Sequence, residues 1–197
     1  MLNEKLKNYH IILASGSPRR QNFFRDLGLD FEIRLKSIEE DYPPSLKHFE
    51  ITNYLAQLKS LPYEEELLDN DILITSDTIV WHNNEALGKP KTAGQAFEMI
   101  SSLSGKTHEV ITSVCFKTKD FQKTVYATTK VTLKALTKEE IHYYIATFNP
   151  YDKAGAYGIQ EWFGFIAVTK IEGSYFNVMG LPTHLVYKTL NSIVSTN

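Results

Sequence analysis

Ile11-Ile-Leu-Ala-Ser-Gly-Ser-Pro-Arg-Arg20 joins an apolar run to two serines, a proline and two arginines. The apolar run predicts a buried strand, and Pro18 predicts a helix shortly after it, because proline is favoured at the first helical position. The first turn of a helix has unpaired backbone N–H groups and partial positive charge. Nearby hydroxyl and guanidinium groups can add charge-assisted hydrogen bonds to an anion. The segment therefore predicts a phosphate site, with an ordinary serine-capped strand–helix turn as the alternative.

Composition limits the class of protein. The 197 residues suffice for one domain or two closely joined lobes, and the net charge of −2 gives no support for binding a nucleic-acid polymer. Cys115 is the single cysteine, which excludes an intrachain disulfide and fits a reducing cytosol. Met1 to His10 lacks the apolar run of a secretion signal, and no apolar segment approaches the roughly 20 residues that span a membrane. We therefore expect a cytoplasmic protein without a membrane partner.

The rest of the sequence alternates between helical and extended patterns. Apolar residues at helical spacing predict helices at 51–58, 93–103 and 138–148. Pro18 with Gly28 predicts a helix at 18–27, and Pro182 predicts a last helix to about residue 194. Thr137 with Glu140 predicts a capping box, and Thr92 with Gln95 resembles one. Apolar or alternating runs predict further strands at 31–35 and 72–80, a hairpin of 109–118 with 124–136 that has one face in water, and a second hairpin of 163–171 with 175–178. This order indicates a mixed α/β sheet with antiparallel parts.

Several common active sites lack their sequence signatures. Gly88-Lys89-Pro90 has neither the upstream glycine nor the following serine or threonine of a Walker A loop. The six histidines are scattered, with no pair at the helical spacing of metal ligands, which argues against a histidine-bound zinc site. A Gly-x-Ser-x-Gly elbow is also absent.

A few polar residues stand in conspicuous places. Asp77 interrupts an apolar strand, and a buried carboxylate is costly unless it meets a cation, a metal or hydrogen-bond donors, which predicts a functional role. The alternative is an aspartate that caps a turn. Lys89 alone is equally consistent with a surface lysine. The stretch 153–160 places small residues around a tyrosine, as in a loop close to a ligand or in a tight packing corner. Glu39 and Glu40 could hold a divalent cation or lie in a solvated loop.

Six motifs, in this order, resemble the Maf family of nucleoside triphosphate pyrophosphatases, also called septum-formation-inhibitor-like proteins. The motifs are Ala14-Ser-Gly-Ser-Pro-Arg-Arg20, Ser76-Asp-Thr-Ile-Val80, Gly88-Lys-Pro90, Leu103-Ser-Gly-Lys-Thr-His108, Asp152-Lys-Ala-Gly-Ala-Tyr-Gly-Ile-Gln160 and Gly173-Ser-Tyr-Phe-Asn-Val-Met-Gly-Leu-Pro182. They are spread from residue 14 to residue 182, so the resemblance covers nearly the whole chain, and six ordered motifs are far more specific than any one of them.

The resemblance implies a fold and a reaction. The expected fold is a single domain over 1–197, with an elongated mixed β-sheet flanked by helices as in inosine-triphosphate pyrophosphatases and two lobes around one active-site cleft. Family members cleave a nucleoside triphosphate between its α and β phosphates, which yields the monophosphate and diphosphate. The implied cofactor is a divalent metal, Mg²⁺ or Mn²⁺. A homodimer is one assembly that the resemblance allows.

The resemblance also assigns roles to residues. Asp77 matches the catalytic carboxylate, taken as the base that activates water, although a metal-ligand role is hard to separate from it. The positions that would hold the triphosphate are Ser15, Arg20, Lys59 and Lys89. Glu40 matches an acidic position associated with metal or water. The positions that set base preference are Arg19, Thr78 and Gln160. This trio resembles the subgroup that acts on dTTP and UTP and differs from the subgroup that acts on 7-methyl-GTP.

Two departures and two alternatives remain. Ser60 and Leu61-Pro62 follow Lys59 where the family usually continues its helix, and Glu161-Trp162-Phe163 is bulky after Gln160. One alternative function is a nucleotide-binding regulator of cell division that does not turn nucleotides over. Another is a phosphatase of small phosphomonoesters, which would release orthophosphate. Asp77 together with Lys89 favours catalysis, because binding alone needs no water-activating base.

Overall fold

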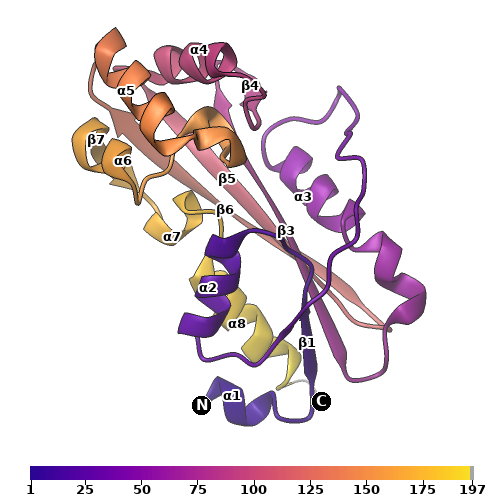
Figure 1. The fold of residues 1–197 in the computed structure, drawn as a ribbon. Coiled ribbons are helices and arrows are strands. Elements are labelled where there is room, and N and C mark those ends of the chain that lie inside the picture. Colours follow the sequence, from indigo (N-terminus) through magenta and orange to yellow (C-terminus); the bar gives the residue numbers. More distant parts are fainter. Residues whose placement is uncertain (196–197) are drawn as a thin grey trace. The chain divides into compact units, whose positions relative to one another are not determined.

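The structure is a computed structural model that describes residues 1–195 (Figure 1). The chain divides into two compact units. The first unit comprises Met1–Asp77, Thr112–Ala127 and the chain from Gly180 onward. The second unit comprises Thr78–Ile111 and Thr128–Met179.

Each helix and most strands lie entirely within one of the two units, whereas three strands contribute residues to both. The elements of the first unit are α1 (Leu2–Lys5), β1 (His10–Leu13), α2 (Pro18–Asp26), β2 (Glu32–Ile33), α3 (Phe49–Leu58), the 3₁₀-helix η1 (Leu61–Glu66) and α8 (Thr183–Ile193). Those of the second are β4 (Glu85–Leu87), α4 (Ala93–Leu103), α5 (Lys138–Phe148), the 3₁₀-helices η2 (Pro150–Asp152) and η3 (Ala154–Ala156), α6 (Trp162–Ala167), β7 (Val168–Glu172) and α7 (Tyr175–Val178). The shared strands are β3 (Asp71–His82), β5 (Thr107–Lys117) and β6 (Gln122–Leu133).

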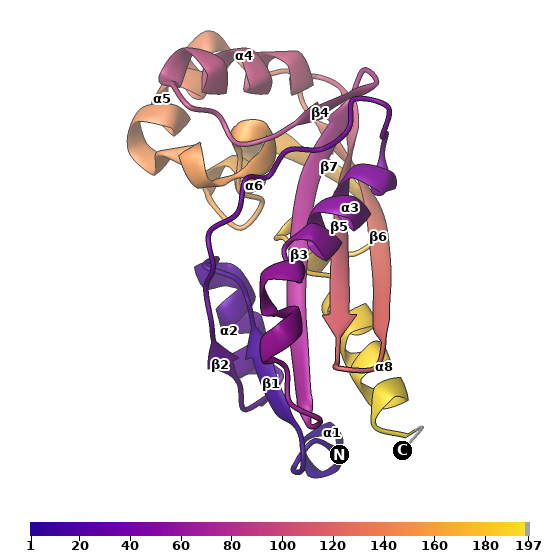
Figure 2. The same cartoon turned by 90° about the vertical axis from the view of Figure 1, so that its right-hand side faces the viewer.

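The strands form one seven-stranded mixed sheet in the order β2-β1-β3-β5-β6-β7, with β4 paired to β3. Strand β1 runs parallel to β2 and β3, whereas β4 runs antiparallel to β3 and β7 antiparallel to β6. The predicted mixed α/β fold is therefore confirmed. Figure 2 shows α3 lying along the sheet in the first unit, where Thr52 and Gln57 of α3 hydrogen-bond to Ser113 of β5 and Thr124 of β6.

Local signals fixed several boundaries as predicted. Helix α2 begins at Pro18 after the N-cap Ser17, and helix α5 has the complete capping box of Thr137 and Glu140. At α4 the box is incomplete. Thr92 accepts the hydrogen bond from the Gln95 backbone, but the Gln95 side chain accepts from the backbone of Lys91 instead of that of Thr92.

The predicted hairpin of 163–171 with 175–178 is wrong. Residues Trp162–Ala167 form helix α6, and 175–178 form helix α7, while the strand between them pairs with β6. A short apolar run fits a buried helix as well as a strand, and here the buried Phe163 and Ala167 share one helical face. Helix α7 begins where Ser174 accepts a hydrogen bond from the backbone of Asn177. A Cβ on Gly164 would overlap the carbonyl oxygen of Ile159, so α6 packs directly on the preceding loop.

The expected wet face of the 109–136 hairpin is also incorrect for its first strand. Strand β5 is buried from Val110 to Lys117, because it lies between β3 and β6 and is not at an edge. Strand β6 keeps the alternation only near its end, where Thr129, Val131 and Leu133 are buried. Central position in the sheet, rather than the alternation in sequence, decided the burial of β5.

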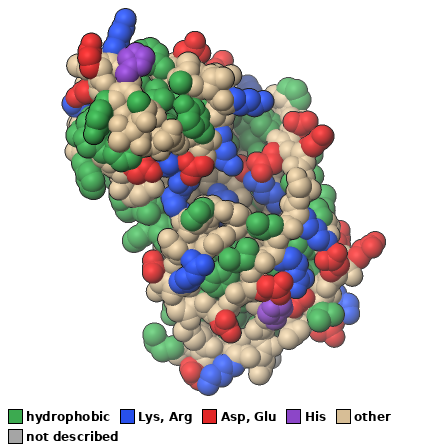
Figure 3. All heavy atoms as spheres, viewed as in Figure 1, with side chains coloured by type: hydrophobic (Ala, Val, Ile, Leu, Met, Phe, Trp, Pro, Cys, Tyr) green, Lys and Arg blue, Asp and Glu red, His purple; other side chains and the backbone are tan. Residues whose placement is uncertain are grey.

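The second unit has its own core and one exposed aromatic face. Its buried cluster joins the inner faces of α4 and α5 to the segment 156–167. On its outer side, Tyr143 of α5 and Phe165 of α6 are 52% and 82% exposed. Figure 3 shows hydrophobic side chains gathered over this part of the surface. The buried cluster includes Tyr157 and Ile159, so it anchors the segment that ends at Gln160.

Candidate active site

The turn between β1 and α2 is held by its own hydrogen bonds. Ser15 is buried, its hydroxyl accepts from the Ser17 backbone N–H at 3.3 Å, and its carbonyl oxygen accepts from the Gln21 side chain at 3.1 Å. Within residues 1–195, the Ser17 side chain makes no capping hydrogen bond to α2. The start of α2 therefore has the unpaired N–H groups and partial positive charge that suit an anion.

Arg20 projects from the first turn of α2 and is fixed by backbone acceptors. Its Nε donates to the carbonyl oxygen of Gly180 at 2.9 Å, and its Nη1 donates to that of Ser76 at 3.0 Å. The same Nη1 lies 3.5 Å from the Ser15 hydroxyl oxygen. Burial lowers the pKa of Arg20 from its ordinary value, an effect that the Asp77 carboxylate opposes. Arg20 is therefore a cation held in one position beside the turn between β1 and α2.

Asp77, Lys59 and Glu40 come together from three separate segments of the first unit. Asp77 lies in β3 and is 7% exposed, Lys59 caps the end of α3, and Glu40 belongs to the acidic loop. The Lys59 Nζ lies 2.7 Å from Asp77 Oδ1 and 3.1 Å from Glu40 Oε1. The buried carboxylate thus has the cationic partner that its burial requires. The helix does end at Leu58, as the residues after Lys59 suggested.

The candidates Arg19 and Thr78 are sequence neighbours of Arg20 and Asp77. Arg19 precedes Arg20 in α2, and Thr78 follows Asp77 in β3, where the second unit begins. Both side chains are partly buried. Because successive side chains of a strand point to opposite faces, Thr78 and Asp77 lie on different faces of β3.

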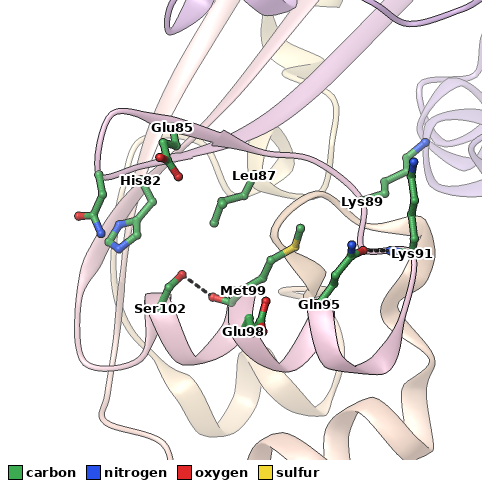
Figure 4. Close-up of a pocket in the computed structure, with 10 residues that line it drawn as sticks. His82, Glu85, Leu87, Lys89, Lys91, Gln95, Glu98, Met99 and Ser102 are labelled. Atoms are coloured by element: carbon green, nitrogen blue, oxygen red, sulfur yellow. Dashed lines mark hydrogen bonds between the residues drawn. The ribbon is translucent and has the colours of Figure 1, made fainter.

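Lys89 belongs to the second unit and lies beside a cavity of about 490 Å³. Figure 4 shows the ammonium groups of Lys89 and Lys91 at one end of this cavity, on the same side, with Leu87 and Met99 in its middle. Lys89 is exposed, and within residues 1–195 neither ammonium group forms an ion pair. Two neighbouring cations without carboxylate partners are suited to an anion.

The glycine-bearing loop 153–160 packs against the strand that leads to Lys89. The Gly155 backbone N–H donates to the carbonyl oxygen of Gly88 at 3.0 Å. Gly155 has a φ of +69°, and a Cβ there would lie 2.7 Å from a methyl group of Val80. A tight packing corner therefore explains this glycine. Gln160, at the end of the loop, is partly buried, and its side-chain amide has no hydrogen-bond partner in the described chain.

Sequence reasoning missed the polar groups beneath this loop. The Tyr157 hydroxyl lies 2.7 Å from Nε2 of His108, and burial lowers the pKa of His108 to about 4. The pair is therefore neutral and supports the loop from inside the core. Tyr144, predicted only as part of an apolar helix face, also reaches the loop through its hydroxyl. Helical spacing identifies a buried tyrosine but does not identify the partner of its hydroxyl group.

Two acidic residues at the site, Glu40 and Asp77, could take part in binding a divalent metal. Among residues 1–195, no cluster of three or more histidine, cysteine, aspartate or glutamate residues could hold a metal by itself. Glu40 and Asp77 supply two carboxylates within reach of one ammonium group. Carboxylates with phosphate oxygens and water are the ligands that Mg²⁺ prefers, so the residues fit a metal bound mainly through a phosphorylated substrate.

Comparison with known proteins gives consistent results. The family model described as Maf-like protein matches residues 10–193. The chain is 68% identical to the dTTP/UTP pyrophosphatase of Flavobacterium johnsoniae, over 98% of this chain and 100% of that protein. It is 56% identical to the dTTP/UTP pyrophosphatase of Christiangramia forsetii, over 100% of both. A Ham1 protein from Coxiella burnetii shares the fold with a TM-score of 0.50 and 12% identity, over 93% of this chain and 99% of that chain.

Proposed function

The chain belongs to the family of Maf-like proteins, and from this membership we propose that it hydrolyses dTTP and UTP to the monophosphate and diphosphate. The observation that carries the proposal is the 68% identity to a dTTP/UTP pyrophosphatase along its entire length. The side chains support it, because Arg20, Lys59 and Asp77 supply fixed cations and a buried carboxylate within one unit. Phosphoryl transfer needs mainly such positioning and charge neutralisation.

Product identity tests the reaction. Incubation of the purified protein with UTP should yield UMP and diphosphate, resolved by chromatography. Orthophosphate without diphosphate would indicate a phosphatase instead. UTP binding without any product would contradict the hydrolase and favour the alternative of a nucleotide-binding regulator, which has no use for a water-activating base.

We assign the attack on the triphosphate, and all of its predicted contacts except that of Lys89, to residues of the first unit. The Ser15 hydroxyl, the start of α2 and the Arg20 guanidinium would bind phosphate oxygens. Lys59 contacts only one oxygen of Asp77, and within residues 1–195 the other oxygen has no hydrogen-bond partner, so it can accept a proton from water. Lys89 is assigned to the triphosphate by its family motif and its unpaired ammonium group.

The proposed cofactor is Mg²⁺ or Mn²⁺. Glu40 and Asp77 are the residues that would hold it. When bound, such an ion neutralises charge on the triphosphate oxygens. The Lys59 ammonium, which contacts both carboxylates, keeps them together in the structure described here.

Removal of either cation should weaken catalysis. We expect Arg20→Ala and Lys89→Ala each to lower kcat/KM for UTP by an amount equivalent to roughly 1.5–3 kcal/mol, the scale of a hydrogen bond to a charged group. Arg25→Ala is a matched control, because Arg25 lies on the same helix and donates to the exposed Asn22. A loss for Arg25→Ala equal to that for Arg20→Ala would contradict a specific role for Arg20.

The proposed base preference rests on Arg19, Thr78 and Gln160. An amide can both donate and accept, which suits the imide edge of uracil and thymine, where N3–H lies between two carbonyl groups. A site that pairs with this edge leaves buried groups unpaired when cytosine or a purine enters. We expect dTTP and UTP to be hydrolysed well ahead of CTP, ATP and 7-methyl-GTP, and Gln160→Glu to reduce that preference. Specificity constants for the five nucleotides measure it, and equal values for UTP and 7-methyl-GTP would overturn the subgroup assignment.

Location and assembly are separate proposals. We propose a cytoplasmic enzyme, which the single, buried Cys115 supports. A homodimer is proposed from the family resemblance, and the exposed Tyr143 and Phe165 mark a candidate contact face. Across residues 1–195, none of the helices has both the length and the apolar character needed to cross a membrane.

A further inference from the structure

Glu161, which directly follows Gln160, has both carboxylate oxygens engaged. Its Oε1 lies 3.0 Å from Nζ of Lys153, and its Oε2 accepts a hydrogen bond from the Tyr144 hydroxyl at 2.5 Å. The Lys153 and Tyr144 side chains are buried, and only a fifth of the Glu161 side chain is exposed. A carboxylate held at both oxygens by buried partners has one defined position.

Tyr144 connects this carboxylate to the backbone of the loop. Its hydroxyl donates to Glu161 and accepts from the Gly158 backbone N–H at 2.9 Å. Its ring packs between Phe148 and Phe163, with centroid distances of 5.2 and 5.0 Å. Burial and, to a smaller extent, the hydrogen bond to Glu161 raise the pKa of Tyr144, so the hydroxyl keeps its proton and remains a donor. One rigid side chain therefore fixes two points of the loop.

Lys153 closes the loop from its other end. Residue 153 begins the loop 153–160 and residue 161 directly follows it, so their ion pair joins the two ends of the loop. Inside the loop, a Cβ on Gly158 would lie 2.8 Å from the carboxyl carbon of Glu161. The loop backbone thus packs against the Glu161 carboxylate itself, with no side chain between them. In contrast, the Gln160 amide has no hydrogen bond in the described chain, so the protein fixes the point from which this side chain extends and not the amide itself.

We propose that Glu161 is a positioning residue for base selection, which holds the backbone of Gln160 through Tyr144 and Lys153 and so fixes the place from which the Gln160 side chain reaches the base. The inference rests on the proposed function, in which Gln160 contacts the base edge. A base-reading amide discriminates only if it reaches the base edge at the right place, because a backbone shift of about an ångström already moves its donor and acceptor out of hydrogen-bond register. Glu161, the first of the bulky residues after Gln160, therefore has an inward-facing role.

Kinetics with two pyrimidine nucleotides test the inference. The specificity constants for UTP and CTP are measured for the wild type, Glu161→Gln, Tyr144→Phe, Gln160→Ala and the Gln160→Ala/Glu161→Gln double variant. Glu172→Gln is the matched control, because Glu172 forms an exposed ion pair with Lys170 in the same unit. Thermal unfolding of each variant shows whether it is folded at the assay temperature.

We expect Glu161→Gln to lower the UTP-to-CTP ratio of specificity constants about tenfold, mainly through KM for UTP, with kcat changed less than about threefold. Tyr144→Phe, which keeps the ring and the ion pair, should lower the ratio in the same direction. Glu172→Gln should leave it unchanged. In the Gln160→Ala background the Glu161 substitution should have no further effect on the ratio, because Glu161 acts through Gln160.

The outcomes separate the inference from the proposed function. If Gln160→Ala lowers the ratio while Glu161→Gln and Tyr144→Phe do not, the positioning role is wrong and the role of Gln160 stands. If Gln160→Ala also leaves the ratio unchanged, Gln160 does not select the base and the inference fails with it. An equal fall in kcat for both nucleotides would make Glu161 merely structural. If Glu161→Gln does not fold, Tyr144→Phe decides the question.

Discussion

Asp77→Asn is expected to fold and to lose roughly 100-fold or more of the turnover of UTP, the usual size of a positioned acid–base group. The substitution preserves the shape of the side chain and an oxygen that can accept from Lys59, which lies 2.7 Å from the native carboxylate. It removes the basic oxygen that would take the proton from water. Binding should change less than kcat, because the phosphate-binding cations remain.

The measurement is kcat on purified protein, with the folded fraction checked by thermal unfolding. Asp71→Asn is the matched control, since Asp71 is a buried carboxylate in the same strand that is bonded to His10 and to the backbone of Leu68. That control should lose stability and keep its turnover per folded molecule. Retention of more than about half of the wild-type rate by Asp77→Asn would show that the base is another group.

Removal of divalent metal is expected to abolish hydrolysis of dTTP and UTP. A triphosphate polyanion repels a carboxylate and the negative charge that develops on water as it loses its proton, and the site provides two carboxylates, Glu40 and Asp77, that fit a metal able to neutralise the phosphate charge. The protein is treated with EDTA, dialysed into metal-free buffer and assayed for diphosphate release. Activity should return when Mg²⁺ or Mn²⁺ is added.

Two comparisons make the metal experiment decisive. EDTA saturated with Mg²⁺ should leave activity intact, which excludes inhibition by the chelator itself. Glu40→Gln should raise the Mg²⁺ concentration required for half of the maximal rate, because one proposed carboxylate ligand is lost. Full activity in carefully metal-free buffer would overturn the metal requirement.

The parts of the fold that were predictable depend on neighbouring residues. Pro18 and the capping box of Thr137 and Glu140 fixed helix starts because their hydrogen bonds and dihedral limits are local. The long apolar run of β3 was equally clear. The failures concern features decided by tertiary partners: the burial of β5 follows from its central place in the sheet, and α6 follows from packing against the loop before it.

The candidate site, like the fold, was only partly predictable from the sequence. The six motifs identified the Maf-like family, which the family match confirms, but the roles of the individual residues stay predictions. The burial of Asp77 could be inferred from its apolar strand. Its pairing with Lys59, and through Lys59 with Glu40, depends on how distant segments pack in three dimensions, which sequence spacing does not reveal. The bond from Tyr144 to Glu161 was unpredictable for the same reason, because periodicity describes the ring of a tyrosine and not its hydroxyl group.

The contact between α6 and the preceding loop has a consequence for protein engineering. Gly164 lies against the carbonyl oxygen of Ile159, so any side chain there would push on the residue next to Gln160. A mutant library aimed at new nucleotide preferences should therefore leave Gly164 unchanged and randomise Gln160 and Trp162. Position 164 limits which evolutionary routes to new substrates are open, although its own side chain is a single hydrogen atom.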